Sequence, residues 1–465
     1  MAQETRGEWG SRLGFILAAA GSAVGLGNVW KFPYITGENG GGLFVIIYLV
    51  CIALIGLPIM IGEVMLGRMT KRAPVGAFRK LAGDKSPWKT VGWIGIAAGF
   101  VILSFYSVAA GWAMDYVVLA IKGEFSGGAD PSVISSRFES VSGDGTGAIL
   151  WHVAFMALTI AIVIGGVQKG VEIAARVMMP LLLLMFVALL IFATTLDGFG
   201  QGFDFVFGLH TDKLEAGSVL EALGHSFFTL SVGMGAMLTY GSYLKKDDDI
   251  ISASIAISVL DTLVALMACM VLFPITFSYG LEPTAGPALV FKNIPLAFAQ
   301  LPGSQIWAVT FFVLLVFAAL TSAISLLEVS ASYFIDELGW SRSVAVPVTG
   351  GAIILLGIPS ALAASSELFG ASMQASFIGK DWFTFVDDLA SKWMLPLCGL
   401  GISMFAAWRL GGEARRAQFA AGSTLGKLEW LYLTWLQILR YLVPIAIVLI
   451  MLYALGVFTK LGLTG

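Results

Sequence analysis

The stretch Gly21-Ser22-Ala23-Val24-Gly25-Leu26-Gly27-Asn28 lies inside an apolar segment that runs from about residue 13 to residue 35. A segment of this length can cross a bilayer as a helix. Its glycines lower the helix propensity in the middle of the span. A break there exposes backbone N–H and C=O groups, which a membrane tolerates only where the break lines a cavity or is buried in protein. We therefore expect a broken membrane helix with a binding site at the break.

The same pattern returns 208 residues later, counted from Val24 to Val232, in Ser231-Val232-Gly233-Met234-Gly235. Two glycine-interrupted spans at corresponding positions of two halves indicate the midplane site of a secondary transporter. The alternative is that the glycines only let helices pack closely. The matched second copy favours the transporter.

Hydrophobic residues make up 58% of the chain and charged residues 12%, whereas globular domains carry about 25% charged residues. We therefore expect a polytopic protein in the lipid bilayer. The net charge of −3 gives no reason to expect a nucleic-acid partner. Cys51, Cys269 and Cys398 lie in apolar runs, which predicts packing residues rather than disulfides. The first dozen residues are polar and the first apolar run is a full span, so no cleavable signal peptide is expected.

Eleven apolar runs are long enough to be membrane spans. They are 12–36, 42–67, 89–121, 147–165, 171–195, 219–244, 250–279, 304–337, 343–363, 382–409 and 431–457. About eighteen Lys and Arg residues lie in one set of alternating loops and six in the other. Positive loops stay inside, which predicts a cytoplasmic N-terminus, an extracellular C-terminus and a location in the inner or plasma membrane.

This pattern predicts two inverted repeats of five spans and one further span. The predicted organisation is a cytoplasmic segment 1–11, a first repeat 12–195, an extracellular loop 196–218, a second repeat 219–409, a cytoplasmic loop 410–430, and a last span with a short extracellular tail, 431–465.

A broken helix offers amides to an anion and carbonyls to a cation. We expect the amides of Gly25, Leu26 and Gly27 to bind a substrate carboxylate. Carbonyl and side-chain oxygens suit Na⁺, as they suit other hard cations. The expected oxygen ligands belong to Gly21, Ala23, Val24, Asn28, Thr229 and Ser231. Thr321 and Ser322 either extend this set or bond their own helix carbonyls, as such hydroxyls usually do.

Ionisable residues inside spans are functional candidates by default. They are Lys31, Glu63, Asp261, Glu328, Asp387 and Asp388. Bound Na⁺ would keep a buried Asp261 ionised. Lys31 is expected either to close an outer gate with Asp387 or Asp388, or to reach the membrane surface as a snorkelling lysine. Glu63 and Glu328 are expected to share a proton, because two neighbouring carboxylates rarely both ionise.

These residues resemble the neurotransmitter:sodium symporter family, whose bacterial members include LeuT-like amino-acid transporters. The strongest matches are the segments Gly21–Tyr34, Asn39–Gly42, Phe227–Gly235 and Ala318–Ser322. The resemblance implies the LeuT fold, an all-α polytopic protein with a 5+5 inverted repeat and unwound first and sixth helices. It also favours the ligand role of Thr321 and Ser322.

The resemblance further implies two Na⁺ sites and one substrate pocket. The first Na⁺ site would use the substrate carboxylate with Ala23, Asn28, Thr229 and Asp261. The second would use Gly21, Val24, Ala318, Thr321 and Ser322. The pocket would comprise Ala23, Gly25, Leu26, Gly27, Ile102, Tyr106, Phe228, Thr229, Ser231, Met234, Ser322 and Leu326. Within it, Tyr106 would hydrogen-bond the carboxylate and Phe228 would form a lid. An inner gate would pair Arg6 with Asp336, with Trp9 nearby.

The chain departs from the family pattern in two places. Lys31 stands where many members have Arg, so the outer gate loses bidentate geometry. Asp261 stands where others have Asn, and Ala265, on the same helix face, lacks the acid or hydroxyl of other members. We infer that Asp261 supplies a fixed negative charge, that Tyr48 and His225 orient it, and that no chloride is needed.

The expected partner is a small-molecule substrate, a hydrophobic or aromatic α-amino acid. Gly25 stands where monoamine transporters carry Asp, so an amine-only ligand would lack a counter-charge, whereas a zwitterion brings its own carboxylate. Two alternatives stay open: a Na⁺ symporter for a γ-aminobutyrate, taurine or betaine type of substrate, and a non-transporting amino-acid sensor. No enzyme constellation is present in the sequence, and a monomer or weak homodimer is expected.

Overall fold

The computed structural model describes residues 7–126, 130–209, 213–283, 289–300, 303–376 and 378–460, and all regular elements within these ranges are helices. Nine continuous helical stretches of this part of the chain are long and apolar enough to cross a membrane. They are Gly42–Thr70 (α3, Gly42–Cys51, to α4, Leu57–Thr70), Lys89–Ile121 (α6), Gly145–Ile164 (α8), Val167–Ala193 (a π-helical turn, then α9, Ile173–Ala193), Ile250–Ser278 (α13), Ser304–Leu338 (α15), Arg342–Ala361 (α16), Trp382–Arg409 (α18, Trp382–Asp388, to α19, Leu395–Met404) and Glu429–Ala454 (α21, Glu429–Gln437, to α22, Val443–Ala454).

Two further spans are broken. The helix α1 (Arg12–Ala23) is followed, after a bend of 48°, by the helical segment Gly27–Glu38, which ends in α2 (Phe32–Glu38). The helices α11 (Ala216–Thr229) and α12 (Ala236–Gly241) flank the second break. Both breaks fall on the predicted glycine-bearing stretches. In the described part of the chain the bent pair raises the number of segments that could cross a membrane to ten, and α11 and α12 lie where the remaining predicted segment, 219–244, was expected. The main differences are at the ends, since the fifth segment starts four residues earlier than predicted, at Val167.

The second break depends on residues with left-handed backbone conformations. Ser231, Gly233 and Gly235 have φ values of 51°, 81° and 75°, which L side chains rarely adopt. A Cβ on Gly233 would also lie 2.5 Å from the carbonyl oxygen of Leu395. Glu63 of α4 accepts hydrogen bonds from the amides of Gly233 (2.6 Å) and Leu238 (3.3 Å). The break is thus held open by backbone conformation and by a buried carboxylate that satisfies its amides.

Several helices begin at a side chain that caps their free amides. Ser11 accepts a hydrogen bond from the amide of Gly14 at the start of α1. Asp249 caps α13 by accepting from the amides of Ile251 and Ser252. Polar residues at these positions explain why the spans start close to where the apolar runs begin.

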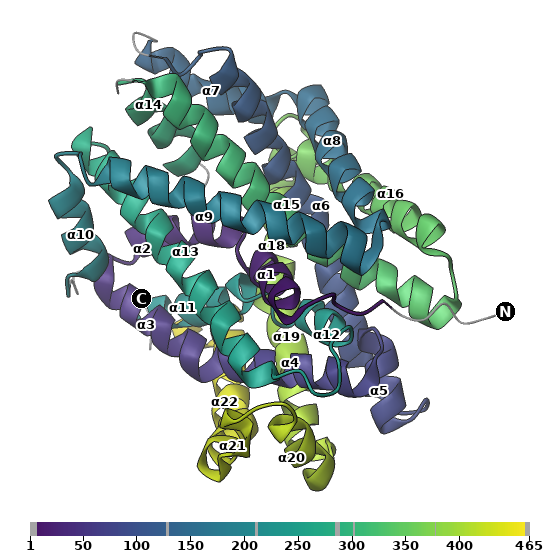
Figure 1. Ribbon diagram of the computed structural model, residues 1–465. Coiled ribbons are helices and arrows are strands. Elements are labelled where there is room, and N and C mark those ends of the chain that lie inside the picture. Colours follow the sequence, from purple (N-terminus) through teal and green to yellow (C-terminus); the bar gives the residue numbers. More distant parts are fainter. Residues whose placement is uncertain are drawn as a thin grey trace.

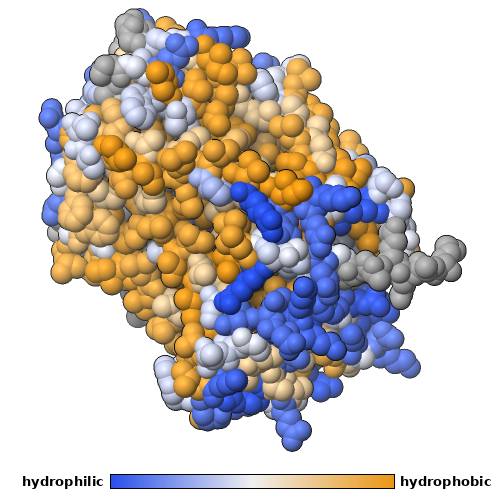
Figure 2. Space-filling model, viewed as in Figure 1, coloured by the Kyte–Doolittle hydropathy of each residue, from blue (hydrophilic) through white to orange (hydrophobic). Residues whose placement is uncertain are grey.

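The helix α1 lies near the centre of the bundle, close to α9 and α12 (Figure 1). The helix α20 (Gly412–Ala420) and the start of the last span project together at one end of the molecule. Hydrophobic side chains cover the broad face over α3, α9, α10 (Phe199–Phe207) and α13, as a lipid-facing surface requires (Figure 2). Hydrophilic side chains gather where α1 begins, near α12 and α5 (Pro74–Ala82). We call this end the Trp9 side, and the opposite end of the broken helices the Lys31 side.

Candidate functional site

The two broken helices meet at their breaks. Ser231 donates a 2.7 Å hydrogen bond to the carbonyl oxygen of Ser22. A small cavity of about 20 Å³ lies between the breaks. Its lining residues are Ser22, Ala23, Gly25, Gly27, Ile102, Tyr106, Phe228, Ser231, Met234, Ser322 and Leu326. The structure therefore brings ten of the twelve predicted pocket residues around one cavity and adds Ser22.

One end of this cavity presents hydrogen-bonding groups of the first break. The amide of Leu26 donates to the hydroxyl of Tyr106 at 3.0 Å, which leaves the tyrosine proton free to donate to a carboxylate. The amide of Gly25 donates to Oδ1 of Asn28, also at 3.0 Å. A Cβ on Gly25 would lie 2.4 Å from Ser322 Oγ and 2.6 Å from Tyr106 Oη. Only glycine fits between these two side chains.

A buried acid and its partners lie directly beside the first break. Asn28 Nδ2 donates to Asp261 Oδ1 at 2.7 Å and to Thr229 Oγ1 at 3.1 Å. The Thr229 hydroxyl donates to the same carboxylate at 3.0 Å. None of the three side chains is more than 1% exposed. Among the described residues, the carboxylate accepts from an amide and a hydroxyl, and no positively charged side chain is paired with it, so its buried charge is uncompensated there.

A second group of oxygens joins the break to α15. Ser322 Oγ lies 3.0 Å from the carbonyl oxygen of Ser22 and 3.3 Å from those of Gly21 and Val24. Thr321 Oγ1 lies 3.4 Å from the Val24 oxygen and 3.0 Å from that of Ala318. All five residues predicted for the second Na⁺ site therefore place oxygens around one point. The Thr321 hydroxyl also bonds carbonyls of its own helix, at Phe317 and Ala318, as the alternative interpretation foresaw, whereas the contacts of the Ser322 hydroxyl lead to the first break.

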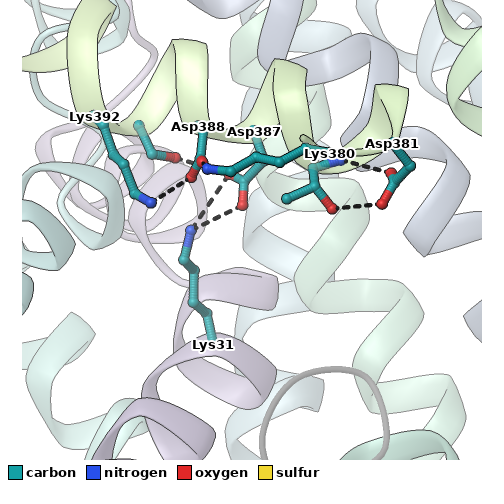
Figure 3. Close-up of polar contacts among 8 residues, drawn as sticks. Lys31, Lys380, Asp381, Asp387, Asp388 and Lys392 are labelled. Carbon is teal, nitrogen blue, oxygen red and sulfur yellow. Dashed lines mark hydrogen bonds and ion pairs between the residues drawn. The ribbon is translucent and has the colours of Figure 1, made fainter. Parts of the chain in front are cut away.

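On the Lys31 side, an ion pair lies next to the ring of Phe228, the residue predicted to form a lid. Lys31 Nζ is 3.3 Å from Asp387 and 4.9 Å from the ring centre of Phe228. The neighbouring Asp388 is engaged instead by Lys380 and by Lys392, the latter at 2.7 Å (Figure 3). Of the two predicted partners, Asp387 is therefore the one that Lys31 contacts. Beyond the lid lies a cavity of about 750 Å³, lined among others by Lys31, His225 and Phe228.

On the Trp9 side, the N-terminal segment is tied to the end of α12. The Trp9 amide donates to the Tyr243 oxygen at 3.2 Å, and its indole nitrogen donates to the Tyr240 oxygen at 2.9 Å. Asp336 accepts from the amide of Ala73 at 2.8 Å. The predicted inner gate between Arg6 and Asp336 includes a residue outside the described ranges.

Two predictions about buried polar groups are corrected. Glu328 is paired with Arg342 and accepts from Tyr243 Oη at 2.6 Å, whereas Glu63 accepts the two backbone amides described above. Glu63 and Glu328 therefore do not share a proton, because each carboxylate has its own partners. His225 does not orient Asp261, since its ring stacks on Phe32 with centroids 5.6 Å apart and neither ring nitrogen has a hydrogen-bond partner among the described residues.

The sequence reasoning missed three residues of the site and its surroundings. Ser22 is neither glycine nor ionisable and therefore gave no signal, although it lies in the last turn of α1, just before the first break. Arg342 lies one residue before a predicted span, and Glu172 is the second residue of the predicted fifth span. Glu172 could have been noticed as an ionisable residue just inside a predicted span, which is a sign of a functional role.

Two glycine-bearing helix breaks that meet at a small cavity are the arrangement of a secondary transporter. A family model described as the sodium:neurotransmitter symporter family matches residues 6–128 and 136–463, and the chain belongs to this family. It is therefore a sodium-dependent membrane transporter.

Relatives match almost the whole chain. The uncharacterized sodium-dependent transporter YhdH of Bacillus subtilis is 37% identical over 459 residues, covering 99% of this chain and 100% of that protein. The human sodium- and chloride-dependent neutral and basic amino acid transporter B(0+) is 24% identical, covering 98% of this chain and 80% of that protein. The crystal structure of MhsT in complex with L-phenylalanine matches with a TM-score of 0.88 and 43% identity, over 96% of this chain and 99% of that one. The predicted LeuT fold is thereby confirmed.

Proposed function

We propose that the protein couples inward Na⁺ movement to the uptake of a hydrophobic or aromatic α-amino acid, without chloride. The observation that carries this proposal is the cavity between the breaks, which is lined by Tyr106 and an apolar wall and which adjoins the oxygens around Asn28 and Asp261 through Gly25, whose amide donates to Asn28. A zwitterion with an apolar side chain needs these three surroundings together.

The carboxylate of the substrate would be held by Tyr106 and the amides of the first break. Because Gly25 carries no acid, the ligand itself has to supply the negative charge. Ile102, Met234 and Leu326 form an apolar wall for the side chain, and methionine adapts to different shapes. MhsT, which is 43% identical, has been crystallised with L-phenylalanine, and this supports a similar substrate class here.

The first Na⁺ would lie among Ala23, Asn28, Thr229 and Asp261. Asn28 now turns its amide nitrogen toward Asp261, and a rotation of the side-chain amide would present its oxygen instead. The ion would offset the buried charge of Asp261 and touch the substrate carboxylate. Direct contact between the Na⁺ ion and the substrate would make the binding of each depend on the other.

The second Na⁺ would join α1 to α15 through Gly21, Val24, Ala318, Thr321 and Ser322. Its departure would release α1 on the Trp9 side. Alternating access would then be a rocking of the first, second, sixth and seventh spans against the others, with the Trp9 side facing the cytoplasm. The fixed charge of Asp261 would take the place of chloride.

Uptake by proteoliposomes tests this proposal. With Na⁺ outside and K⁺ inside, labelled phenylalanine should accumulate, and it should not accumulate when K⁺ replaces Na⁺ on both sides. Leucine and tryptophan should compete, whereas γ-aminobutyrate and betaine should not. Accumulation that is indifferent to Na⁺, or competition only by γ-aminobutyrate or betaine, would contradict the proposed coupling or substrate class.

A further inference from the structure

Glu172 connects the start of the fifth span to the start of the first. It ends the π-helical turn Val167–Glu172, and its side chain is 4% exposed. Its Oε2 accepts the amide of Gly10 at 2.7 Å, and its Oε1 lies 3.4 Å from the hydroxyl of Ser11. These contacts join segments more than 160 residues apart.

Arg176 completes the contact from the next turn of α9. Its Nη2 donates to Glu172 Oε1 at 2.5 Å and to Ser11 Oγ at 2.7 Å. Ser11 is the N-cap of α1 and accepts from the amide of Gly14. Glu172 and Arg176 therefore hold the capping residue of the helix that carries Gly21, and a carboxylate at this helix N-terminus is also favoured by the helix dipole.

Gly14 leaves room for this arrangement. A Cβ at Gly14 would lie 2.0 Å from Glu172 Oε1 and 2.6 Å from its Cγ. A Cβ at Gly10 would lie 3.2 Å from both carboxylate oxygens. The first turn of α1 is thus shaped to bring its backbone against this one carboxylate.

The contacts of the N-terminal segment divide between two groups of spans. Trp9 bonds to Tyr240 and Tyr243 at the sixth span, and Arg12 lies 3.8 Å from Asp249 at the seventh. In the proposed rocking motion these spans move together with the first. The hydrogen bonds of Glu172 instead connect the N-terminal segment to the fifth span, which does not move with the first. The hydrogen bond from Gln168 to the Glu8 oxygen makes the same connection. Opening on the Trp9 side therefore has to break the Glu172 contacts.

We propose that Glu172 is a positioning residue that holds the start of α1 against α9 in the closed state, so that its release controls opening on the Trp9 side. This inference rests on the proposed function. The Glu172 bonds are charge-assisted and therefore stronger than neutral ones, while Arg176 is 47% exposed. The contacts of Glu172 are thus strong enough to favour the closed state, and the exposure of Arg176 lets water replace them during opening.

Thiol labelling of the purified, full-length protein tests the inference. Ala18 is 3% exposed and lies one turn after Gly14 on the same face of α1, so a cysteine placed there reports separation of α1 from α9. The native cysteines Cys51, Cys269 and Cys398 are buried. A18C in the otherwise unchanged protein should be labelled more slowly in Na⁺ with phenylalanine than in K⁺.

Adding E172Q should accelerate labelling of A18C in Na⁺ with phenylalanine by about tenfold, because a charge-assisted contact is lost. R176Q, which changes an exposed side chain, should act in the same direction if E172Q folds poorly. R12Q is the matched control, because it breaks a pair between spans that move together, and it should leave the rate unchanged. A cysteine at Ala193, at the far end of α9, should also be unaffected, which separates gate opening from general loosening.

The two failures can be told apart. If A18C alone is labelled equally in Na⁺ with phenylalanine and in K⁺, the proposed sodium-coupled closure is wrong. If A18C is protected but neither E172Q nor R176Q accelerates its labelling, Glu172 does not hold the gate. Equal acceleration at Ala18 and Ala193 would also overturn the inference, because it would show a purely structural role.

Discussion

Lys31 Nζ lies 3.3 Å from both carboxylate oxygens of Asp387, directly above the lid residue Phe228. The adjacent Asp388 does not compete for Lys31, because Lys380 and Lys392 engage it (Figure 3). The two carboxylates are neighbours in sequence but have separate partners. Among the described residues Asp387 is therefore the carboxylate that pairs with Lys31, and we propose that this pair closes the Lys31 side.

Asp387→Asn should release bound substrate faster. Loss of a half-buried ion pair above the lid should raise the dissociation rate of labelled phenylalanine about fivefold. Asp388→Asn is the matched control and should leave this rate unchanged, because Asp388 is paired with Lys380 and Lys392 and not with Lys31. Equal acceleration by both variants would show that the general charge of the region, rather than the Lys31 pair, retains the substrate.

Na⁺-driven uptake should not require chloride, but it should require Asp261. Replacing chloride by gluconate should leave Na⁺-driven uptake unchanged, whereas Asp261→Asn should reduce it at least about tenfold, since the buried cation would lose its fixed counter-charge. Adding Ala265→Glu to Asp261→Asn returns an acid to the same helix face and should restore part of the Na⁺-dependent binding. Loss of uptake in gluconate with the unaltered protein would refute chloride independence.

Thr321→Ala should weaken sodium binding rather than folding. Removing one of the oxygens that converge on Gly21 and Val24 should raise the Na⁺ concentration for half-maximal phenylalanine binding about tenfold. Thr159→Ala makes the same change in the fourth span, where the hydroxyl bonds its own helix at the Phe155 oxygen, and it should have no effect. A Na⁺ titration of each variant decides between the ligand role and the helix-bonding role of Thr321.

Gly25→Ala should block the pocket. The added methyl group would lie within 2.6 Å of Ser322 Oγ and Tyr106 Oη, where the proposed substrate carboxylate also binds, so phenylalanine affinity should fall at least about tenfold. Gly351→Ala in α16 is the control, because nothing lies within 4 Å of the added atom. Unchanged phenylalanine binding by Gly25→Ala would contradict the position proposed for the carboxylate.

The fold was predictable from the sequence because the membrane imposes long apolar runs, and because glycines mark the breaks at Gly25 and Gly233. The grouping of Asn28, Thr229 and Asp261 was predictable by resemblance, since these residues lie on short, recognisable segments. These features are local in the sequence, and local patterns carry most of the information about a membrane helix.

Pairings between distant side chains were not predictable in the same way. Glu63 and Glu328 are both buried acids, but Glu328 faces Arg342 from the next helix, and only the register of the packed helices decides this. The choice of Asp387 over Asp388 depends on Lys380, which lies before the tenth span. The role of Glu172 depends on how the first turn of α1 lies against α9, which composition does not reveal.

The most direct test of the central claim is equilibrium binding of labelled L-phenylalanine to the purified protein in Na⁺ and in K⁺. We predict saturable binding in Na⁺ and no binding in K⁺. Asn28→Ala and Thr321→Ala should each shift this binding to higher Na⁺ concentrations. Binding of equal strength in Na⁺ and K⁺ would contradict a sodium-coupled site between the two broken helices.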